Sequence, residues 1–525
     1  MFARFVERLM LVSLVVLPAE GTARAGDEGL SISMRVDLGR DVGQNFGSLF
    51  EARDADGKVV AGAGYLGAYN TQARSDRRLL HFYVTTPEPG AFTPVALPRV
   101  NDNAGVYLYE YDNRLFAKSR GGPDGKLRVW DAETRTWRLE TDTVPFSIHV
   151  GHGVLTGSSR GMAYNGQSVL EIEDGSGILA EPYYANAFIA YRHVDHDATP
   201  PVNELVARGW TPTDRTAKSV TEDGAIAMGT PREFVYAWGQ LGDHIVAATN
   251  TGGVYVFDGE KWKTLLEPDV NVSFQIYAML NYRDKLLMGQ YPTGELFEYD
   301  GRALRRREGW PPVMPGVSKL AREAQTLTIY GGEIHAGVWP WAEVWRYAEN
   351  AAAWTFMGRM FTHPELTDKT THPYEEETKR LGAVLNHWGQ RVTSLVPLGD
   401  ALYISTSSKG GTPYEPKFAF LADGDKWKEY GVVYRHRKPG TLVVPTVWTD
   451  GPTTFTLEVR DGRLQVTQDG KTLGTADAGA AFPKWHFSHR IRWGEGVFGK
   501  FRGRIEHRAP RAKPKPAAKR AHLGR

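Results

Sequence analysis

Short apolar runs separated by Gly, Asp and Asn turns extend through most of this 525-residue chain. In one example, Val235–Trp238 is followed by the turn residues Gly242 and Asp243 and then by the apolar run Ile245–Thr249. Runs of about five residues that alternate in polarity and end at such turns are typical of β-hairpins. The pattern therefore predicts an all-β protein.

One unit recurs along the chain. It consists of a glycine, a short strand that ends in an aromatic residue, an Asp-Gly turn and often a Trp, as in Gly253–Trp262 and Gly294–Gly301. The aromatic residues that mark the copies are Trp130, Tyr164, Phe257, Tyr299, Tyr347 and Phe420. Several spacings match the length of one four-stranded propeller blade, about 40–50 residues. The wider gap between Tyr164 and Phe257 leaves room for a degenerate blade or a long insertion.

These units resemble those of kelch-like and related bacterial β-propellers, although the double-glycine and Trp pattern of a standard kelch repeat is incomplete. The resemblance covers roughly residues 100–435 and implies six or seven four-stranded blades. Propellers serve as binding proteins, scaffolds, hydrolases, lyases and oxidases, so the resemblance predicts a fold and leaves the function open.

The flanking segments are also rich in β-strand signals. Residues 27–97 are expected to supply a first blade or the strands that close the ring, because an open propeller exposes a sheet edge. Residues 441–508 form a β-rich extension that faintly resembles the closing strands of a laminin-G or concanavalin-like sandwich. This extension is either a partial module or the partner of residues 27–97, which would leave six blades. We place the propeller within residues 26–440.

The N-terminus has the features of a secretory signal over residues 1–25. Arg4 and Arg8 precede the mostly apolar run Leu9–Leu17, and Ala23-Arg24-Ala25 is a small-x-small cleavage site. No later stretch is long and apolar enough to span a bilayer. The chain has no cysteine, which excludes thiol, zinc-thiolate and iron–sulfur chemistry. We expect an exported protein, periplasmic or extracellular, of a bacterial type in which disulfides are dispensable.

Charge is concentrated at the C-terminus. The chain has 63 basic and 61 acidic residues, a net charge of +2, and seven of the basic residues lie in Arg508–Arg525, where there is no acid. The remainder is mildly acidic, which argues against a nucleic-acid partner. Residues 509–525 are predicted to be a basic disordered tail. This tail either contacts an anionic surface, such as an envelope polymer or membrane, or is simply solvated.

Two histidine pairs are candidate metal ligands. His193 and His196 lie in a segment with Asp195 and Asp197, and His149 and His152 lie at a strand and turn. Imidazole and carboxylate groups bind divalent metals. The alternative is that these are loop histidines that are solvated or hydrogen-bonded. The sequence contains no other recognisable cofactor motif.

A long connection over residues 361–391 carries the residues most suited to proton transfer. His372, Tyr374 and His387 are candidate catalytic residues here, beside the acidic run Glu375–Glu377. Long loops on a rigid scaffold often carry functional sites, and such side chains could move protons in a polysaccharide hydrolase or lyase. The alternative is a short helix, Tyr374–Asn386, with a solvated charged face.

Trp339, Trp341, Trp388 and Arg391 are candidate ligand-binding residues, because the faces of indole rings pack well against sugars. The sequence Trp339-Pro340-Trp341 predicts an exposed loop or edge. The alternative is that these tryptophans are wedges between neighbouring blades.

Two functional hypotheses follow. The first is an exported binding or scaffold protein for an envelope or extracellular ligand, with a glycan as the leading candidate. The second is a carbohydrate-active hydrolase or lyase with a His/Tyr/Glu site at the propeller mouth. Convergence of the candidate histidines at one mouth would favour the enzyme, and their dispersal would count against it.

Overall fold

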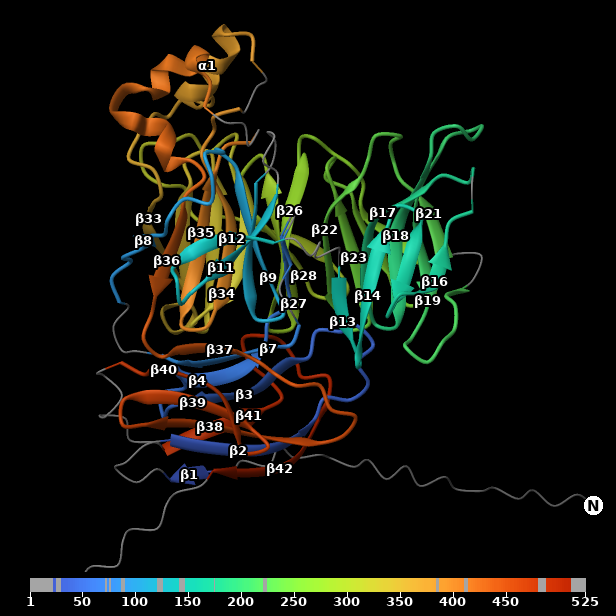
Figure 1. Ribbon diagram of the computed structural model, residues 1–525, viewed down its shortest axis with the longest axis vertical. Coiled ribbons are helices and arrows are strands. Elements are labelled where there is room, and N and C mark those ends of the chain that lie inside the picture. Colours follow the sequence, from blue (N-terminus) through green and yellow to red (C-terminus); the bar gives the residue numbers. More distant parts are fainter. Residues whose placement is uncertain are drawn as a thin grey trace, which may run out of the picture.

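The computed structural model describes residues 22–24, 30–70, 73–74, 77–85, 90–119, 126–140, 147–173, 175–220, 224–383, 387–409, 414–479 and 488–510. The predicted signal segment and basic tail lie outside these residues, except for 22–24 and 509–510. The protein consists of a β-propeller with a β-sandwich beneath it (Figure 1). No helix in the described part of the chain is long and apolar enough to cross a membrane.

Within the described residues, seven antiparallel sheets form the blades of the propeller. Blade 1 comprises β9 (Val106–Tyr111), β10 (Arg114–Ser119), β11 (Leu127–Asp131) and β12 (Thr136–Leu139). Blade 2 comprises β13 (Ser147–Val150), β14 (Gly153–Ser158), β15 (Gly161–Tyr164) and β16 (Gln167–Glu171). Blade 3 comprises β17 (Ile178–Ala185), β18 (Phe188–Asp195), β19 (Val202–Gly209), β20 (Lys218–Ser219) and β21 (Ala225–Ala227). Blade 3 occupies the wide gap in the repeat pattern.

The remaining blades follow in chain order. Blade 4 comprises β22 (Val235–Leu241), β23 (His244–Thr249), β24 (Val254–Phe257) and β25 (Trp262–Leu266). Blade 5 comprises β26 (Gln275–Tyr282), β27 (Lys285–Tyr291), β28 (Leu296–Tyr299) and β29 (Leu304–Arg307). Blade 6 comprises β30 (Glu323–Tyr330), β31 (Glu333–Trp339), β32 (Glu343–Ala348) and β33 (Ala353–Arg359), with a short 3-10 turn, η2 (Glu349–Ala351). Blade 7 comprises β34 (Arg391–Leu398), β35 (Ala401–Ser407), β36 (Val433–Arg437) and the early strand β8 (Val95–Ala96).

Strand β8 closes the ring, because Ala96 pairs with Tyr434 and Val95 with Arg435 at the outer edge of blade 7. A second early segment enters the axial channel. There, β5 (Ala68–Asn70) pairs with the inner strand β26 and is followed by β6 (Ala73–Arg74). Strand β5 also contacts β22 and β30. The propeller is therefore closed and plugged by residues that precede its first blade.

The side-chain amide of Asn70 anchors this plug. Its Oδ1 accepts a hydrogen bond from the Leu327 amide at 2.8 Å, and its Nδ2 donates to the Leu327 carbonyl at 3.3 Å. The amide thus satisfies both backbone groups of one residue on the inner strand of blade 6. Because Asn70 is buried, this pair of bonds is shielded from water.

Two sheets form the lower sandwich. One contains β1 (Thr22–Arg24), β41 (Ser488–Trp493), β3 (Gly47–Arg53), β4 (Val59–Tyr65), β7 (Leu79–Val84) and β37 (Thr441–Pro445). The other contains β40 (Lys471–Asp477), β39 (Arg463–Gln468), β38 (Thr453–Arg460), β2 (Leu30–Asp37) and β42 (Arg504–Pro510). Residues from both ends of the chain therefore share each sheet.

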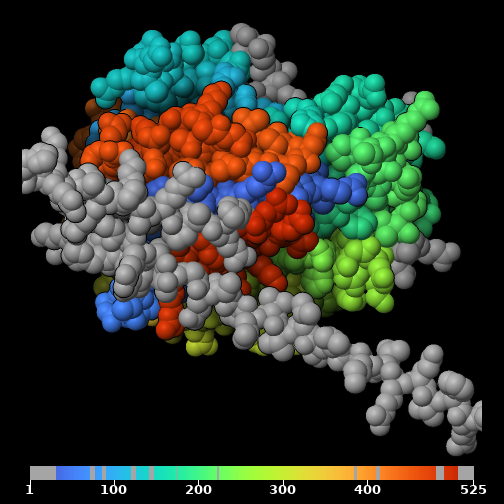
Figure 2. Space-filling view, turned by 90° about the horizontal axis from the view of Figure 1, so that it is seen from below, coloured from blue at the N-terminus to red at the C-terminus, as the bar shows by residue number. Residues whose placement is uncertain are grey.

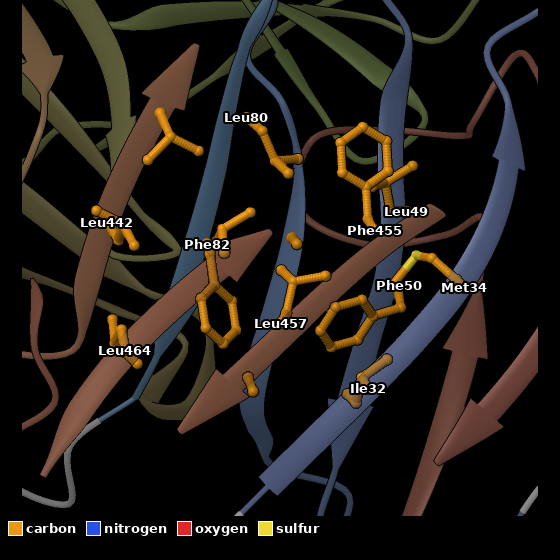
Figure 3. Packing of buried hydrophobic residues seen from close by; sticks show 14 of the residues in the cluster. Ile32, Met34, Leu49, Phe50, Leu80, Phe82, Leu442, Phe455, Leu457 and Leu464 are labelled. Carbon is orange, nitrogen blue, oxygen red and sulfur yellow. The ribbon is translucent and has the colours of Figure 1, made fainter. Parts of the chain in front are cut away.

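The sandwich core follows from the alternation of its strands. Strand β38 alternates buried and half-buried positions, and Phe455 and Leu457 point inward with Ile32 and Met34 of β2 (Figure 3). By contrast, β7 is buried along its whole length, because its second face packs under the propeller. Tyr83 belongs to a cluster with propeller residues on that side. A sheet that is covered on both faces reads as a continuous apolar run.

The sandwich covers only part of the lower face of the propeller, and the blades of residues 150–250 extend beyond it (Figure 2). Charged groups join the two domains at this interface. Glu349 accepts hydrogen bonds from Arg53 of the sandwich at 3.1 Å and from Nε of Arg283 in blade 5 at 2.7 Å.

A cap lies over the opposite, upper end of blades 6 and 7 (Figure 1). It contains α1 (Pro373–Arg380), which lies between β33 and β34, and the 3-10 segments η3 (Pro416–Leu421) and η4 (Asp423–Glu429), which lie between β35 and β36. The repeat copy expected around Phe420 is wrong, because this segment is part of the cap. The third strand of blade 7 is β36 instead. Phe418 and Leu421 form the core of the cap, so their apolar pattern imitates that of a strand.

Candidate functional site

The upper mouth of the axial channel brings charged residues of several blades together. The turns after the inner strands face the sandwich, as Arg283 shows, so these strands begin at the upper end. Glu323 begins β30 and Arg391 begins β34. Arg391 Nη2 lies 3.7 Å from Glu323 Oε2, and both side chains are 3% exposed. The Tyr277 hydroxyl of β26 lies beside the Glu323 carboxyl group. A buried ion pair therefore stands at the mouth.

Helix α1 adds a second carboxyl group from above. His372 caps the helix, because its Nδ1 accepts a hydrogen bond from the Tyr374 amide at 3.1 Å, and Pro373 occupies the first turn. This start places Glu375 in the buried face of the helix. A Cβ atom on Gly389 would lie 2.4 Å from Glu375 Oε1 and 2.4 Å from Trp339 Nε1. Glycine at this position therefore allows the carboxyl group and the indole to approach the mouth.

Burial controls the electrostatics of the mouth. It raises the pKa of Glu375 to about 7, against the opposing effect of Arg391 and Lys409. Burial also raises the pKa of Glu323, again opposed by the charge of Arg391. Both carboxyl groups thus hold protons more tightly than in water. Inside the mouth, one guanidinium group therefore faces two buried carboxyl groups, so potential negative charges outnumber the positive charge.

Aromatic rings border this charged group. Tyr236 and Tyr277 have ring centroids 5.1 Å apart, and those of Tyr291 and Trp339 are 6.1 Å apart. The Arg391 guanidinium lies over the Trp339 ring, 5.1 Å from its centroid. Tyr236 and Tyr291 are partly exposed. The edge of the mouth therefore reaches solvent although the carboxyl groups are buried.

The predicted catalytic residues His372 and Tyr374 lie in the cap, where they make internal contacts. The Tyr374 hydroxyl is 2.8 Å from His363 Nδ1, and His363 Nε2 is 3.2 Å from Glu429. The ring of His372 lies 4.4 Å from that of Trp341. These bonds join α1 to η4 and to blade 6.

His387 and Trp388 also pack inside the cap. The ring of His387 stacks on Phe418 with centroids 5.3 Å apart, and Trp388 packs edge-on against Phe418 and Tyr430. Trp339, Trp341 and Trp388 are all buried. These tryptophans therefore present no solvent-exposed face on which a sugar could stack. Among the candidate ligand-binding residues, Trp339 and Arg391 reach the upper mouth.

The structure disperses the two candidate metal-binding pairs. His193 contacts Glu204 and the Ser176 carbonyl in blade 3, and His196 is exposed in the turn that follows. His152 contacts Asp450 of the sandwich at 2.7 Å, whereas His149 stacks on Tyr111. No group of three or more His, Asp or Glu residues that could hold a metal occurs in the described ranges. The six candidate histidines do not converge at one mouth.

A second candidate site, which we call the lower passage, lies where the propeller meets the sandwich. Its inner chamber encloses about 100 Å³ at the lower end of the channel, and its outer chamber encloses about 550 Å³ beside the turns of blades 4 and 5. Asn45, Gln240 and Asn281 line both chambers. These three residues therefore form the wall that the two adjacent chambers share.

The two chambers differ in chemistry. The inner chamber is lined by the rings of Tyr69, Tyr111, Tyr183 and Trp238, together with Arg77, Glu110 and His149. The outer chamber is lined by charged residues of both signs: Asp243, Asp284, Asp300, Lys500 and Arg502. Trp238 is fully buried, and no described residue accepts a hydrogen bond from its Nε1.

Sequence reasoning missed Glu323, Tyr277 and the lower passage. The sequence did contain one signal for Glu323: a charged residue at the start of an apolar strand, directly after a loop. The lower passage carried no such signal, because its lining comes from sandwich, plug and blades that are distant in sequence.

The arrangement of the sheets defines a seven-bladed β-propeller on a β-sandwich. No protein-family model matches the sequence, and a search of curated proteins also gives no match. Solved propeller structures are similar at low identity. BamB from Moraxella catarrhalis is 14% identical, with 66% of this chain and 98% of that chain covered and a TM-score of 0.34.

Two further solved structures are similar over nearly all of their own length. YCF48 bound to D1 peptide is 10% identical, covering 67% of this chain and 100% of that chain, with a TM-score of 0.35. A mutant of Trypanosoma rangeli sialidase is 9% identical, covering 95% of this chain and 94% of that chain, with a TM-score of 0.23. A propeller fold does not by itself decide between binding and catalysis.

Proposed function

We propose that the protein is an exported propeller that binds a glycan in the lower passage. The observation that carries this proposal is the pair of adjacent cavities where the two domains meet, the inner one lined by aromatic rings. Ligand sites occur preferentially at domain interfaces and combine apolar walls with a few polar groups. The outer chamber has the volume of a typical ligand site.

The lining matches the chemistry of a sugar chain. Hydroxyl groups both donate and accept hydrogen bonds, as do side-chain amides such as those of Asn45, Gln240 and Asn281, which line both chambers and also bond within the protein. The apolar C–H face of a pyranose packs on aromatic rings such as Tyr69 and Tyr111. The buried Trp238 Nε1 supplies a further donor. A saccharide would lie in the outer chamber, against the wall that separates it from the aromatic inner chamber.

Export and the envelope context rest on the two ends of the sequence. The charged start, the apolar run and the Ala23-Arg24-Ala25 site over residues 1–25 support secretion. Cleavage after Ala25 would remove the edge strand β1, which pairs with β41. The basic tail supports contact with an anionic polymer or surface. Mass spectrometry of the N-terminus of the secreted protein tests export, and a mature chain that retains residues 1–25 would contradict it.

Binding is tested by calorimetry and thermal shift with a panel of envelope and plant polysaccharide oligomers. Asp284→Trp places an indole in the outer chamber, and we expect at least a tenfold loss of affinity. Glu133→Trp, at an exposed turn of blade 1 outside the passage, is the matched control and should bind as the unmodified protein does. Equal binding by both variants would contradict the site, and no binding by the unmodified protein would contradict the function.

A carbohydrate-active hydrolase or lyase is the second candidate. The observation in its favour is Glu375, whose pKa of about 7 suits a general acid. The dispersal of the histidines counts against it. Release of reducing ends or unsaturated products by the unmodified protein, with loss of that release in Glu375→Gln, would favour the enzyme over the binding protein.

A further inference from the structure

We propose that the upper mouth is a second binding site, separate from the lower passage, and that it takes a primary ammonium group carried on an organic molecule. The site consists of Glu323, Glu375 and the bordering aromatic rings, with Gln325 two residues further along β30. This inference does not depend on the glycan proposed for the lower passage.

The first argument is a surplus of hydrogen-bond acceptors. The Tyr277 hydroxyl is a hydrogen-bond partner of the Glu323 carboxyl group, yet no described residue donates to Glu323 Oε1 or to Gln325 Oε1, although these residues are 2% and 8% exposed. Buried acceptors without donors are costly, and at native sites they often mark the place of a missing partner. An ammonium group has three N–H donors and no acceptor. It is therefore the complement of these oxygens.

The second argument is charge. Inside the mouth, Arg391 faces the carboxyl groups of Glu323 and Glu375, and both carboxyl groups are buried. Lys409 is exposed at the edge. When both carboxyl groups are ionised, the buried group of three carries a net negative charge. A cation that enters the mouth would neutralise it.

The third argument is the aromatic border. Tyr236, Tyr277, Tyr291 and Trp339 surround the mouth, and ring faces attract organic cations. Arg391 already occupies the Trp339 face in this way. The partly exposed Tyr236 and Tyr291 give a path from solvent. Inorganic cations prefer oxygen ligands alone, so the rings favour an amine over a metal ion.

The ligand could come from a polyamine or from an amino sugar with a free amine, and one experiment separates these sources. Binding of putrescine, of glucosamine oligomers and of their N-acetylated counterparts is measured by calorimetry at pH 8. We expect binding of at least one amine and none of the acetylated oligomers, because acetylation removes the charge. Preference for putrescine would indicate a polyamine, and preference for the glucosamine oligomers an amino sugar.

Glu375→Gln should weaken amine binding at least tenfold, whereas Glu376→Gln on the same helix should leave it unchanged. Binding should tighten from pH 5 to pH 8 as Glu375 ionises, and this dependence should diminish in Glu375→Gln. The other titratable or charged groups that face Glu375 are Glu323 of β30, Arg391 of β34, Lys409 of the loop after β35 and Tyr291 at the end of β27.

Three results would overturn the proposal: no amine binds, acetylated oligomers bind equally, or Glu375→Gln and Gln325→Leu both retain full affinity. Gln325→Leu is included because it changes no charge. Asp284→Trp should bind amines normally, so failure of the lower passage and failure of the upper mouth are distinguishable.

Discussion

Ionisation of Glu375 should make the protein less stable as the pH rises. Its pKa lies at about 7 in the folded protein, against a reference value of 4.5. A carboxyl group with a raised pKa favours folding while it is protonated, so its contribution is complete below the unfolded pKa and is lost as the pH rises through 7. Each unit is worth about 1.4 kcal/mol, and about 2 to 3 kcal/mol should be lost between pH 5 and pH 8.5.

The effect is measured by the midpoint of thermal unfolding. For a chain of 525 residues, the unfolding entropy is about 1 kcal/mol per kelvin, so the loss amounts to about 2 to 3 °C. Between pH 5 and pH 8.5, the unfolding midpoint of Glu375→Gln should fall by about 2 to 3 °C less than that of the unmodified protein. The midpoint of Glu376→Gln should fall as much as that of the unmodified protein. Parallel pH profiles for the unmodified protein and Glu375→Gln would refute the argument, because burial would then not hold a proton on Glu375.

Three further predictions concern buried contacts. Asn70→Ala should lower the free energy of unfolding by about 2 to 4 kcal/mol, measured by chemical denaturation, since it leaves two buried backbone groups of Leu327 without partners; a loss below about 0.5 kcal/mol would mean that the plug does not depend on this amide. Arg322→Met should cost about 3 to 5 kcal/mol by the same measurement, because Glu343, 3.2 Å away and fully buried, would lose its cation; a neutral result would show that Glu343 is protonated. Tyr374→Phe should speed hydrogen exchange in the cap while blades 1–4 stay unchanged, and uniform exchange across the protein would contradict a local role.

The blades that could be predicted from the sequence are those with regular local chemistry. Phe257 and Trp262 end and begin neighbouring strands in the predicted unit, and they are register partners in blade 4. In blade 3 no aromatic residue followed by Asp-Gly ends the third strand, β19, so this strand was not recognised. The segment around Phe420 was wrongly predicted to be a blade strand, because residues buried in the cap are apolar in the same way as residues of a buried strand. Local pattern therefore predicts blades but does not distinguish a blade from a packed insertion.

The candidate sites were harder to predict than the fold. Arg391 and Trp339 were selected for their side-chain chemistry, and the structure places them together at the upper mouth because β31 and β34 meet there. Their predicted companions His372 and Tyr374 point into the cap, a direction set by the start of α1 at Pro373. Which face of a short helix is buried depends on packing that the sequence of eight residues does not specify.

The closure of the ring has a consequence for the order of folding. Strand β8, made early in synthesis, finds its partner β36 only when nearly all blades exist, and β2 must wait for β38 and β42 at the end of the chain. Such long-range pairings slow folding, because loop-closure entropy is lost before the contacts form. The nascent chain would therefore remain uncommitted until its last strands emerge, a state compatible with passage through a narrow translocation pore.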